Sequence, residues 1–302
     1  MIIKKIISSK RIRYAILNAL SWVPDSLMLS CLYWLTLKRW PNLKRPKRFS
    51  EWIQFYKIHY RNSEMAICTD KYLVRDFVKR KLGNKSILNK IYQVCNDANE
   101  INFDELPNKF VIKTTDGGNG DNVLLVRNKS SLSFEEVTKQ INSWKNKKYY
   151  SISREWAYIG AKNSQIIIED LLEDNNSTDG SIDDYKFLCF NGKFQYLWID
   201  KDRFSNHCRG FWNSQFQFLT NVISDHPTFE NEPQLPKNIR EMADIAETLS
   251  NDFPFVRVDL YNVNDQIYFG EMTFYPWSGF IKFSPDIFDY QLGKLFKIQD
   301  AL

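Results

Sequence analysis

Two acidic residues near the C-terminus, Asp259 and Glu271, have the types and spacing of a metal site. Each lies in a run rich in strand-forming residues, and Thr273 follows Glu271 by two positions. A polar segment, 262–266, separates the runs, which is typical of a β-hairpin. Residues two apart in a strand face the same side, so paired strands would present two carboxylates and a hydroxyl together. These oxygens suit Mg²⁺ bound to phosphate, but an ordinary half-exposed hairpin has the same pattern.

A glycine-rich segment lies between two predicted strands, 110–112 and 123–126. Three of the eleven glycines fall there: Gly117, Gly118 and Gly120. Glycines let backbone N–H groups turn toward an anion, and Lys113, just before them, can place a point charge on phosphate. The segment is neither a Walker loop nor a dinucleotide fingerprint. Glycine hairpins are common without a ligand, so this segment alone leaves phosphate binding open.

Basic side chains elsewhere could meet anionic groups. Lys186 alternates with apolar neighbours in a predicted strand, so it points away from the apolar face. Lys71 and Arg75 are spaced to share one face of a helix. Three more cations fall within seven residues: Arg203, His207 and Arg209. Such a cluster suits a carboxylate or phosphate substrate, whereas the alternative is a set of solvated side chains around a structural histidine.

The elements that must position these residues are a mixture of helices and strands. Apolar spacing predicts helices from about Ser50, from Asp70 to Gly83 and from 133 to 145. A buried-type strand covers 165–168, and Asn191-Gly192 joins two further strands in a hairpin. Strands and helices are therefore both expected in the body of the protein.

The totals are those of a folded protein. With 302 residues, 43% hydrophobic and 15% aromatic, the chain can build one large or two to three smaller domains. The five cysteines are odd in number and form no C-x-x-C pair. This pattern argues against a disulfide framework or structural zinc and favours a reduced, cytosolic compartment.

The first 48 residues are strongly basic. They hold eleven Lys and Arg against one acid, Asp25, a net charge of +10, which leaves −5 for the remainder. Uncharged runs at 14–23 and 26–37 are shorter than the roughly 20 residues that span a bilayer, and no secretory cleavage site follows. We expect helices here that lie on an anionic membrane surface or pack on the body with solvated charges. An acidic body without a binding motif argues against nucleic acid.

Several phrases, taken in order, resemble the ATP-grasp superfamily. The closer likeness is to its TupA-like branch, found with teichuronopeptide and bacterial surface-polysaccharide genes. The match covers roughly residues 46–295 and includes DKYLVRDFV, KFVIKTTDGGNGDNV, IIIEDLLED, DYKFLCFNGK, FVRVDLY and IYFGEMTFYPWSGF. The resemblance implies an α+β, ATP-grasp fold in which two α+β subdomains clasp ATP. The expected parts are a basic helical N-terminal extension (1–45), an α/β region (46–108), a small glycine-flap subdomain (109–170) and a large subdomain with the metal site (171–302).

The resemblance also implies roles for individual residues. ATP phosphates would be held by the glycine segment and by three lysines: Lys71, Lys113 and Lys186. Adenine would meet Glu169 and the backbone of Leu171 and Leu172. Mg²⁺ would bind Asp259 and Glu271, with Thr273 where the superfamily usually has asparagine. The catalytic pair would be Arg257, on the transferring phosphoryl group, and Lys186. The cluster Arg203, His207 and Arg209 is the expected site for the acceptor carboxylate.

These roles describe an ATP- and Mg²⁺-dependent carboxylate–amine ligase that works through an acyl-phosphate. The expected substrates are a carboxylate on a surface-polysaccharide precursor, such as a uronic acid, and an amine donor such as an amino acid. We expect the enzyme in the cytoplasm, peripheral on the inner face of the membrane. One alternative is a sugar-nucleotide glycosyltransferase of capsule or O-antigen synthesis, for which Asp183-Asp184 is a weak cue. The other is a non-catalytic nucleotide-binding protein, against which intact Asp259 and Glu271 argue.

Overall fold

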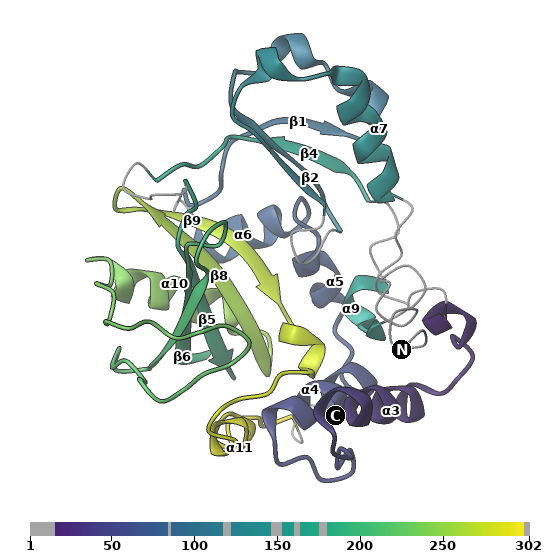
Figure 1. Ribbon diagram of the computed structural model, residues 1–302, viewed down its shortest axis with the longest axis vertical. Coiled ribbons are helices and arrows are strands. Elements are labelled where there is room, and N and C mark those ends of the chain that lie inside the picture. The colour runs from purple at the N-terminus through teal and green to yellow at the C-terminus, as the bar shows by residue number, and fades with distance from the viewer. Residues whose placement is uncertain are drawn as a thin grey trace.

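Two antiparallel sheets form the framework of the protein (Figure 1). The computed structural model describes residues 16–83, 86–116, 122–145, 153–159, 164–174 and 180–298. The small sheet has the order β1-β4-β2-β3, from Ile91–Cys95, Ile166–Glu169, Phe110–Thr114 and Val123–Val126. The large sheet has the order β7-β6-β5-β8-β9, from Cys208–Asn213, Lys193–Lys201, Asp184–Phe190, Phe255–Val263 and Gln266–Thr273.

Helices surround both sheets. The α-helices are α3 (Asp25–Leu37), α4 (Phe49–His59), α5 (Ser63–Thr69), α6 (Val74–Leu82), α7 (Phe134–Lys145), α9 (Trp156–Ile159), α10 (Ile239–Ser250) and α11 (Ile287–Gly293). Short 3-10 turns are η1 (Ala98–Glu100), η2 (Phe103–Glu105), η3 (Lys129–Ser131) and η4 (Pro276–Gly279). Among the described residues, no helix is long and apolar enough to cross a membrane.

Both predicted hairpins of the large sheet are confirmed. Strands β5 and β6 turn at Asn191 and Gly192, whose φ angles are 50° and 73°. Strands β8 and β9 turn at Asn264 and Asp265, whose φ angles are 53° and 62°. Two successive positive φ values are typical of the turn whose twist matches paired strands, and Asn, Asp and Gly tolerate them best. Local turn chemistry therefore sets the register of the strands that carry the acids.

The small sheet packs on α7 through an apolar layer. Val137, Ile141 and Trp144 of this helix are buried, as their spacing predicts. The same apolar cluster includes β1, η1 and η2. The small sheet and its core therefore draw on both the 46–108 and the 109–170 segments.

The large sheet has one apolar face and one polar face. Val258 and Leu260 are fully buried, and Asn262, on the same face, donates to Asn238 next to α10 at 2.6 Å. Helix α10 therefore covers this face. Because side chains alternate along a strand, Lys186 and Asp259 point to the opposite face.

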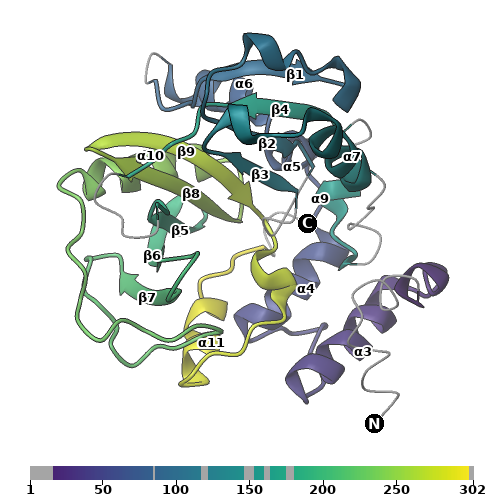
Figure 2. The same cartoon turned by 45° about the horizontal axis from the view of Figure 1, so that its top comes forward.

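A helical N-terminal region is present, as expected. One side of α3 is buried through Met28, Leu29, Tyr33 and Leu37. The Tyr33 hydroxyl lies 2.8 Å from the Ser50 hydroxyl on α4. In Figures 1 and 2, α3 lies outside α4, at the end of the molecule away from the small sheet.

Candidate active site

Three charged residues form a row across the polar face of the large sheet. Lys186 on β5 is in register with Asp259 on β8, which is in register with Glu271 on β9. Side chains directly opposite each other on paired strands lie close enough to interact. The Lys186 ammonium is 3.2 Å from Asp259 Oδ2, and both residues are buried. The predicted pairing of the two acid-bearing strands is therefore present.

Arg257 bridges the two acids of the row. Its Nε donates to Asp259 Oδ1 at 2.6 Å, and its Nη2 donates to Asp259 Oδ2 at 2.5 Å and to Glu271 Oε1 at 2.7 Å. The Thr273 hydroxyl donates to the same Glu271 oxygen at 3.1 Å. The guanidinium also lies 5.0 Å from the ring centre of Trp198. Arg257 is thus fixed by two carboxylates and an indole, and its guanidinium group lies between the two acids of the row.

A second row lies beside the first, and its two acids, Asp184 and Asp200, were not predicted as part of the site. Asp184 on β5 is in register with Asp200 on β6, and Arg209 on β7 continues the row. The Lys186 ammonium forms ion pairs with Asp184 and, at 3.7 Å, with Asp200. Since Asp184 precedes Lys186 by two positions, strand alternation could have indicated a shared face. The partner strand could not be inferred, because strand order is not a local property.

The charges set the protonation of the two acids. Burial raises the pKa of Glu271, but Arg257, Lys71 and Lys186 outweigh this effect and lower the pKa to about 2. Burial raises the pKa of Asp259, and Arg257 and Lys186 only partly offset it. The pKa of Arg257 is raised, because its two carboxylate partners outweigh the effect of burial. The row therefore carries a permanent cation between acids of different strength.

The predicted substrate cluster lies at the end of these strands, and each of its three side chains has an acidic partner. Arg203 Nη1 is 3.0 Å from Asp184 Oδ2. His207 Nε2 is 3.0 Å and Arg209 Nε is 2.6 Å from the same oxygen, Asp200 Oδ1. The cluster is therefore joined to Lys186 through shared carboxylates. Its role toward an acceptor stays a prediction.

Two of the residues predicted to hold the nucleotide, Lys113 and Glu169, lie on the small sheet. Glu169, at the end of β4, is 2.5 Å from the Lys113 ammonium on β2 and 3.7 Å from Arg75 Nη1. Leu171 and Leu172 follow after Asp170 and are half-buried. Gly117, Gly118 and Gly120 lie outside the described residues. Strands β2 and β3, on either side of them, pair as predicted.

Lys71 connects the two groups of residues. Its backbone N–H donates to the Thr115 carbonyl, just past β2, at 3.0 Å. Burial lowers the pKa of its ammonium, Glu271 raises it and Lys113 lowers it further. Lys71 therefore lies within electrostatic reach of both sheets. Figure 2 shows the small sheet lying above β8 and β9, in agreement with this arrangement.

The oxygen donors of the large sheet fit Mg²⁺. Asp259 and Glu271 present carboxylates in register, and hard cations prefer such ligands together with phosphate oxygens. Within the part of the chain that the structure describes, the buried Oδ1 of Asp184 has no hydrogen-bond partner. No three His, Cys, Asp or Glu side chains of these same residues converge as a metal cluster. The fit is therefore to a metal held by two carboxylates, with the Thr273 hydroxyl beside them.

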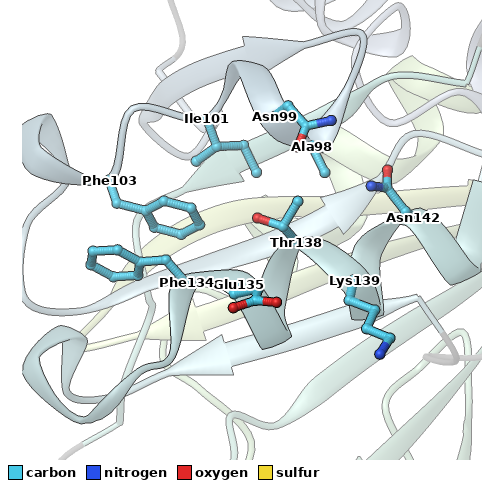
Figure 3. Close-up of a pocket in the computed structure, with 9 residues that line it drawn as sticks. All are labelled: Ala98, Asn99, Ile101, Phe103, Phe134, Glu135, Thr138, Lys139 and Asn142. Atoms are coloured by element: carbon cyan, nitrogen blue, oxygen red, sulfur yellow. The ribbon is translucent and has the colours of Figure 1, made fainter.

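A hollow on the small sheet is separate from this network. Its volume is about 540 Å³, and η1, η2 and α7 line it (Figure 3). Phe103 and Phe134 stack at one end, with ring centres 4.3 Å apart. None of its lining residues belongs to either charged row or to the predicted nucleotide residues.

Comparison with known proteins gives one family. The model of the TupA-like ATP-grasp family matches residues 51–297. No curated protein matches the chain. D-alanine–D-alanine ligase from Bacillus anthracis is 18% identical, with a TM-score of 0.41, and the match covers 68% of this chain and 57% of that one. The same ligase from Helicobacter pylori is 14% identical, with a TM-score of 0.42 and coverages of 82% and 68%. Phosphoribosylamine–glycine ligase from Thermotoga maritima is 16% identical, with a TM-score of 0.40 and coverages of 70% and 48%. The chain thus spans about half to two thirds of the length of these structures.

Proposed function

The chain belongs to the TupA-like ATP-grasp family and has the expected ATP-grasp fold, and from this premise we propose that it is an ATP- and Mg²⁺-dependent carboxylate–amine ligase. The observation that carries the proposal is the row of Lys186, Asp259 and Glu271 with Arg257 between the two acids. Phosphoryl transfer needs positioning and charge neutralisation more than covalent chemistry from the protein. This row supplies both.

We assign the nucleotide to the space between the two sheets. Lys113 and Lys186, with Lys71 between the sheets, neutralise the phosphates, since an ammonium acts as a point charge. Glu169 and the backbone of Leu171 and Leu172 meet the adenine. In this structure Lys113 forms an ion pair with Glu169. In the proposed complex Lys113 leaves Glu169 and contacts a phosphate of the nucleotide instead.

The proposed reaction has two steps. An oxygen of the substrate carboxylate attacks the γ-phosphorus of ATP, the bond to the β–γ bridging oxygen breaks, and ADP leaves. An amine then attacks the acyl carbon, the carbon–oxygen bond to phosphate breaks, and the amine loses its proton. Arg257 contacts the transferring phosphoryl group through its rigid fork of donors. Asp259 and Glu271, with Thr273 beside them, would hold Mg²⁺, which would supply neutralisation of the phosphate charge.

We propose a carboxylated surface-polysaccharide precursor, such as one containing uronic acid, as the acceptor and an amino acid as the amine donor. Arg203, His207 and Arg209 recognise the acceptor carboxylate, because guanidinium groups bind carboxylates through paired hydrogen bonds. We place the reaction in the cytoplasm. All five cysteines are free, which suits a reducing compartment.

A matrix assay tests the proposal. ADP release is measured with Mg²⁺ and ATP for a panel of uronic acids against a panel of amino acids. The expected result is release that requires both partners and forms an amide detected by mass spectrometry. Absence of ATP binding by calorimetry in the presence of Mg²⁺ would overturn the proposal.

The contacts of Asp183 and Asp184, the residues that suggested a glycosyltransferase, do not support that alternative. The Asp183 carboxylate binds Lys201, and the Asp184 carboxylate binds Lys186 and Arg203. Consumption of a sugar nucleotide without ATP in the same assay would favour that alternative instead.

A further inference from the structure

The inner face of α3 is fixed to the body of the protein. Tyr33 is fully buried and contacts Ser50, whose N–H and hydroxyl donate to the two oxygens of Asp289 at 2.9 and 2.7 Å. Arg39, just after α3, also binds Asp289 at 2.8 Å. Arg154 donates to Asp25 at 2.7 Å at the other end of the helix. The helix is therefore held at both ends and along one side.

The outer face of α3 is apolar and exposed. Leu27 and Trp34 are seven residues apart, two helical turns on one side, and are 56% and 42% exposed. Leu35 is 55% exposed, and Trp40, which stacks on Trp34 with ring centres 5.9 Å apart, is 63% exposed. We define these four residues as the α3 surface. In a helix packed in the core these side chains would be buried, and on a helix face that only contacts water these positions would be polar. The α3 surface is neither of these.

Exposed basic residues lie on the α3 surface and in the segment that follows it. Lys38 lies over the Trp34 ring, 5.6 Å from its centre, and is exposed, as are Lys44 and Arg45. The first 48 residues carry a net charge of +10 against −5 in the remainder. Five of those basic residues fall in positions 1–15, outside the described part of the chain. Positive charge is thus concentrated in the part of the sequence that also supplies the exposed tryptophans and leucines of the α3 surface.

We propose that the α3 surface docks on an anionic lipid bilayer. Tryptophan prefers the interface between headgroups and acyl chains, and juxtaposed lysines and arginines are attracted to anionic lipids. A second copy of the chain fits this surface less well. In a symmetric dimer the α3 surface of one copy would face the α3 surface of the other, which would bring like charges together. Since α3 is fixed to the body, docking would hold the whole molecule in one orientation. This inference does not depend on the proposed reaction.

Flotation of the full-length protein with vesicles tests the proposal. Vesicles of phosphatidylglycerol mixed with phosphatidylcholine are compared with vesicles of phosphatidylcholine alone. We expect binding to the anionic vesicles, weakened by salt as expected for screened charges. Deletion of residues 1–45 is not a clean test, because it would uncover Ser50 and Asp289.

Point substitutions identify the surface. The double substitution Lys38→Gln with Lys44→Gln should weaken vesicle binding about 25-fold. This figure assumes that each basic residue near the membrane contributes about 1 kcal/mol to binding. Trp34→Ala with Trp40→Ala should weaken it at least as much. Matched controls are Lys79→Gln on α6 and Leu125→Ala on β3, which are exposed elsewhere. All variants are checked for folding by circular dichroism.

Two results would overturn the proposal. One is equal flotation of wild-type protein and the Trp34→Ala/Trp40→Ala variant. The other is a concentration-dependent dimer, lost in this variant, without binding to anionic vesicles, which would assign the α3 surface to a second copy. Retained vesicle binding by a protein without ligase activity would separate this inference from the proposed reaction.

Discussion

At the scale of single residues, the site is a balance of buried charges. Lys186 pairs with three carboxylates, and Arg257 joins two acids. Removing one partner of a buried ion pair costs more than the pair contributes, because the other charge stays buried. Substitutions here must therefore be isosteric, so that loss of chemistry can be separated from loss of folding.

The first prediction concerns Asp259. Asp259→Asn keeps the shape but removes one negative charge from the metal-binding pair, so ATP turnover should fall by about a thousandfold, the upper effect of losing one charge-stabilising group. Steady-state ADP release measures it. The control is Asp244→Asn, at an exposed position on α10, and should behave as wild type. A folded Asp259→Asn protein with full activity would contradict the proposed metal role.

The second prediction concerns Thr273. Its hydroxyl donates to Glu271 at 3.1 Å, and a hydroxyl can also bind Mg²⁺. If it is a ligand, Thr273→Val should raise the Mg²⁺ concentration for half-maximal activity by about tenfold, the cost of roughly one lost interaction. Thr273→Asn should keep the wild-type value, since an amide oxygen can replace the hydroxyl. An unchanged value for Thr273→Val would limit Thr273 to orienting Glu271.

At the scale of elements, α4 fixes the turn that follows the acid-bearing strand β9. The buried ammonium of Lys57 donates to the Ser278 carbonyl at 2.9 Å and hydroxyl at 2.6 Å, and to the Ser153 carbonyl at 3.0 Å. Trp277 and Ser278 in η4 have φ angles of 51° and 55°. Non-glycine residues adopt such values at a cost and need surrounding contacts to hold them. Lys57 supplies these contacts from a helix remote in sequence.

The third prediction follows from the pKa of Lys57. Burial lowers this pKa from 10.5 to about 8. Between these values the folded protein loses the proton while the unfolded chain keeps it, so the contribution of Lys57 to stability increases as pH rises from 8 to 10.5. Relative to Lys57→Met, the free energy of unfolding of the wild type should rise by about 3 kcal/mol across this window.

Urea unfolding at several pH values measures this difference. Comparison of two proteins cancels the other titrating groups, which are the same in both. Lys79→Met, at an exposed position on α6, should show no such trend. A constant difference between wild type and Lys57→Met would mean that Lys57 keeps its charge throughout.

At the scale of the whole molecule, the proposed nucleotide site depends on both sheets. Lys71 and Lys113 belong to the side of the small sheet, and Lys186 and Glu271 belong to the large sheet. A ligand that binds only the folded arrangement stabilises it by mass action. Nucleotide binding should therefore stabilise the two sheets together.

The fourth prediction is a thermal shift. Mg²⁺ and ATP at about 100 times the dissociation constant should add about 2.7 kcal/mol and raise the unfolding temperature by about 5 °C. Lys186→Met should abolish the shift, because it removes the cation proposed to meet the phosphates. Lys193→Met, an exposed position at the start of β6, should keep it. A full shift in Lys186→Met would place the nucleotide elsewhere.

The sequence by itself determined the local features. Turn residues at Asn191-Gly192 and at 264–265 specify the two hairpins, and alternation places Asp259, Glu271 and Thr273 on one face. Motif phrases give the family, which the matching family model confirms. These features depend on short-range chemistry, in which a few neighbouring residues fix a turn, a strand or a recognisable phrase.

Only the tertiary structure decided how these features meet. It placed β5 beside β8, so that Lys186 lies opposite Asp259, and it paired Arg203 with Asp184 and Arg209 with Asp200. It also brought Lys57 to the turn after β9. The physical reason is that strand order and helix packing depend on burying apolar faces across the whole chain, and no local pattern of residues specifies which elements become neighbours.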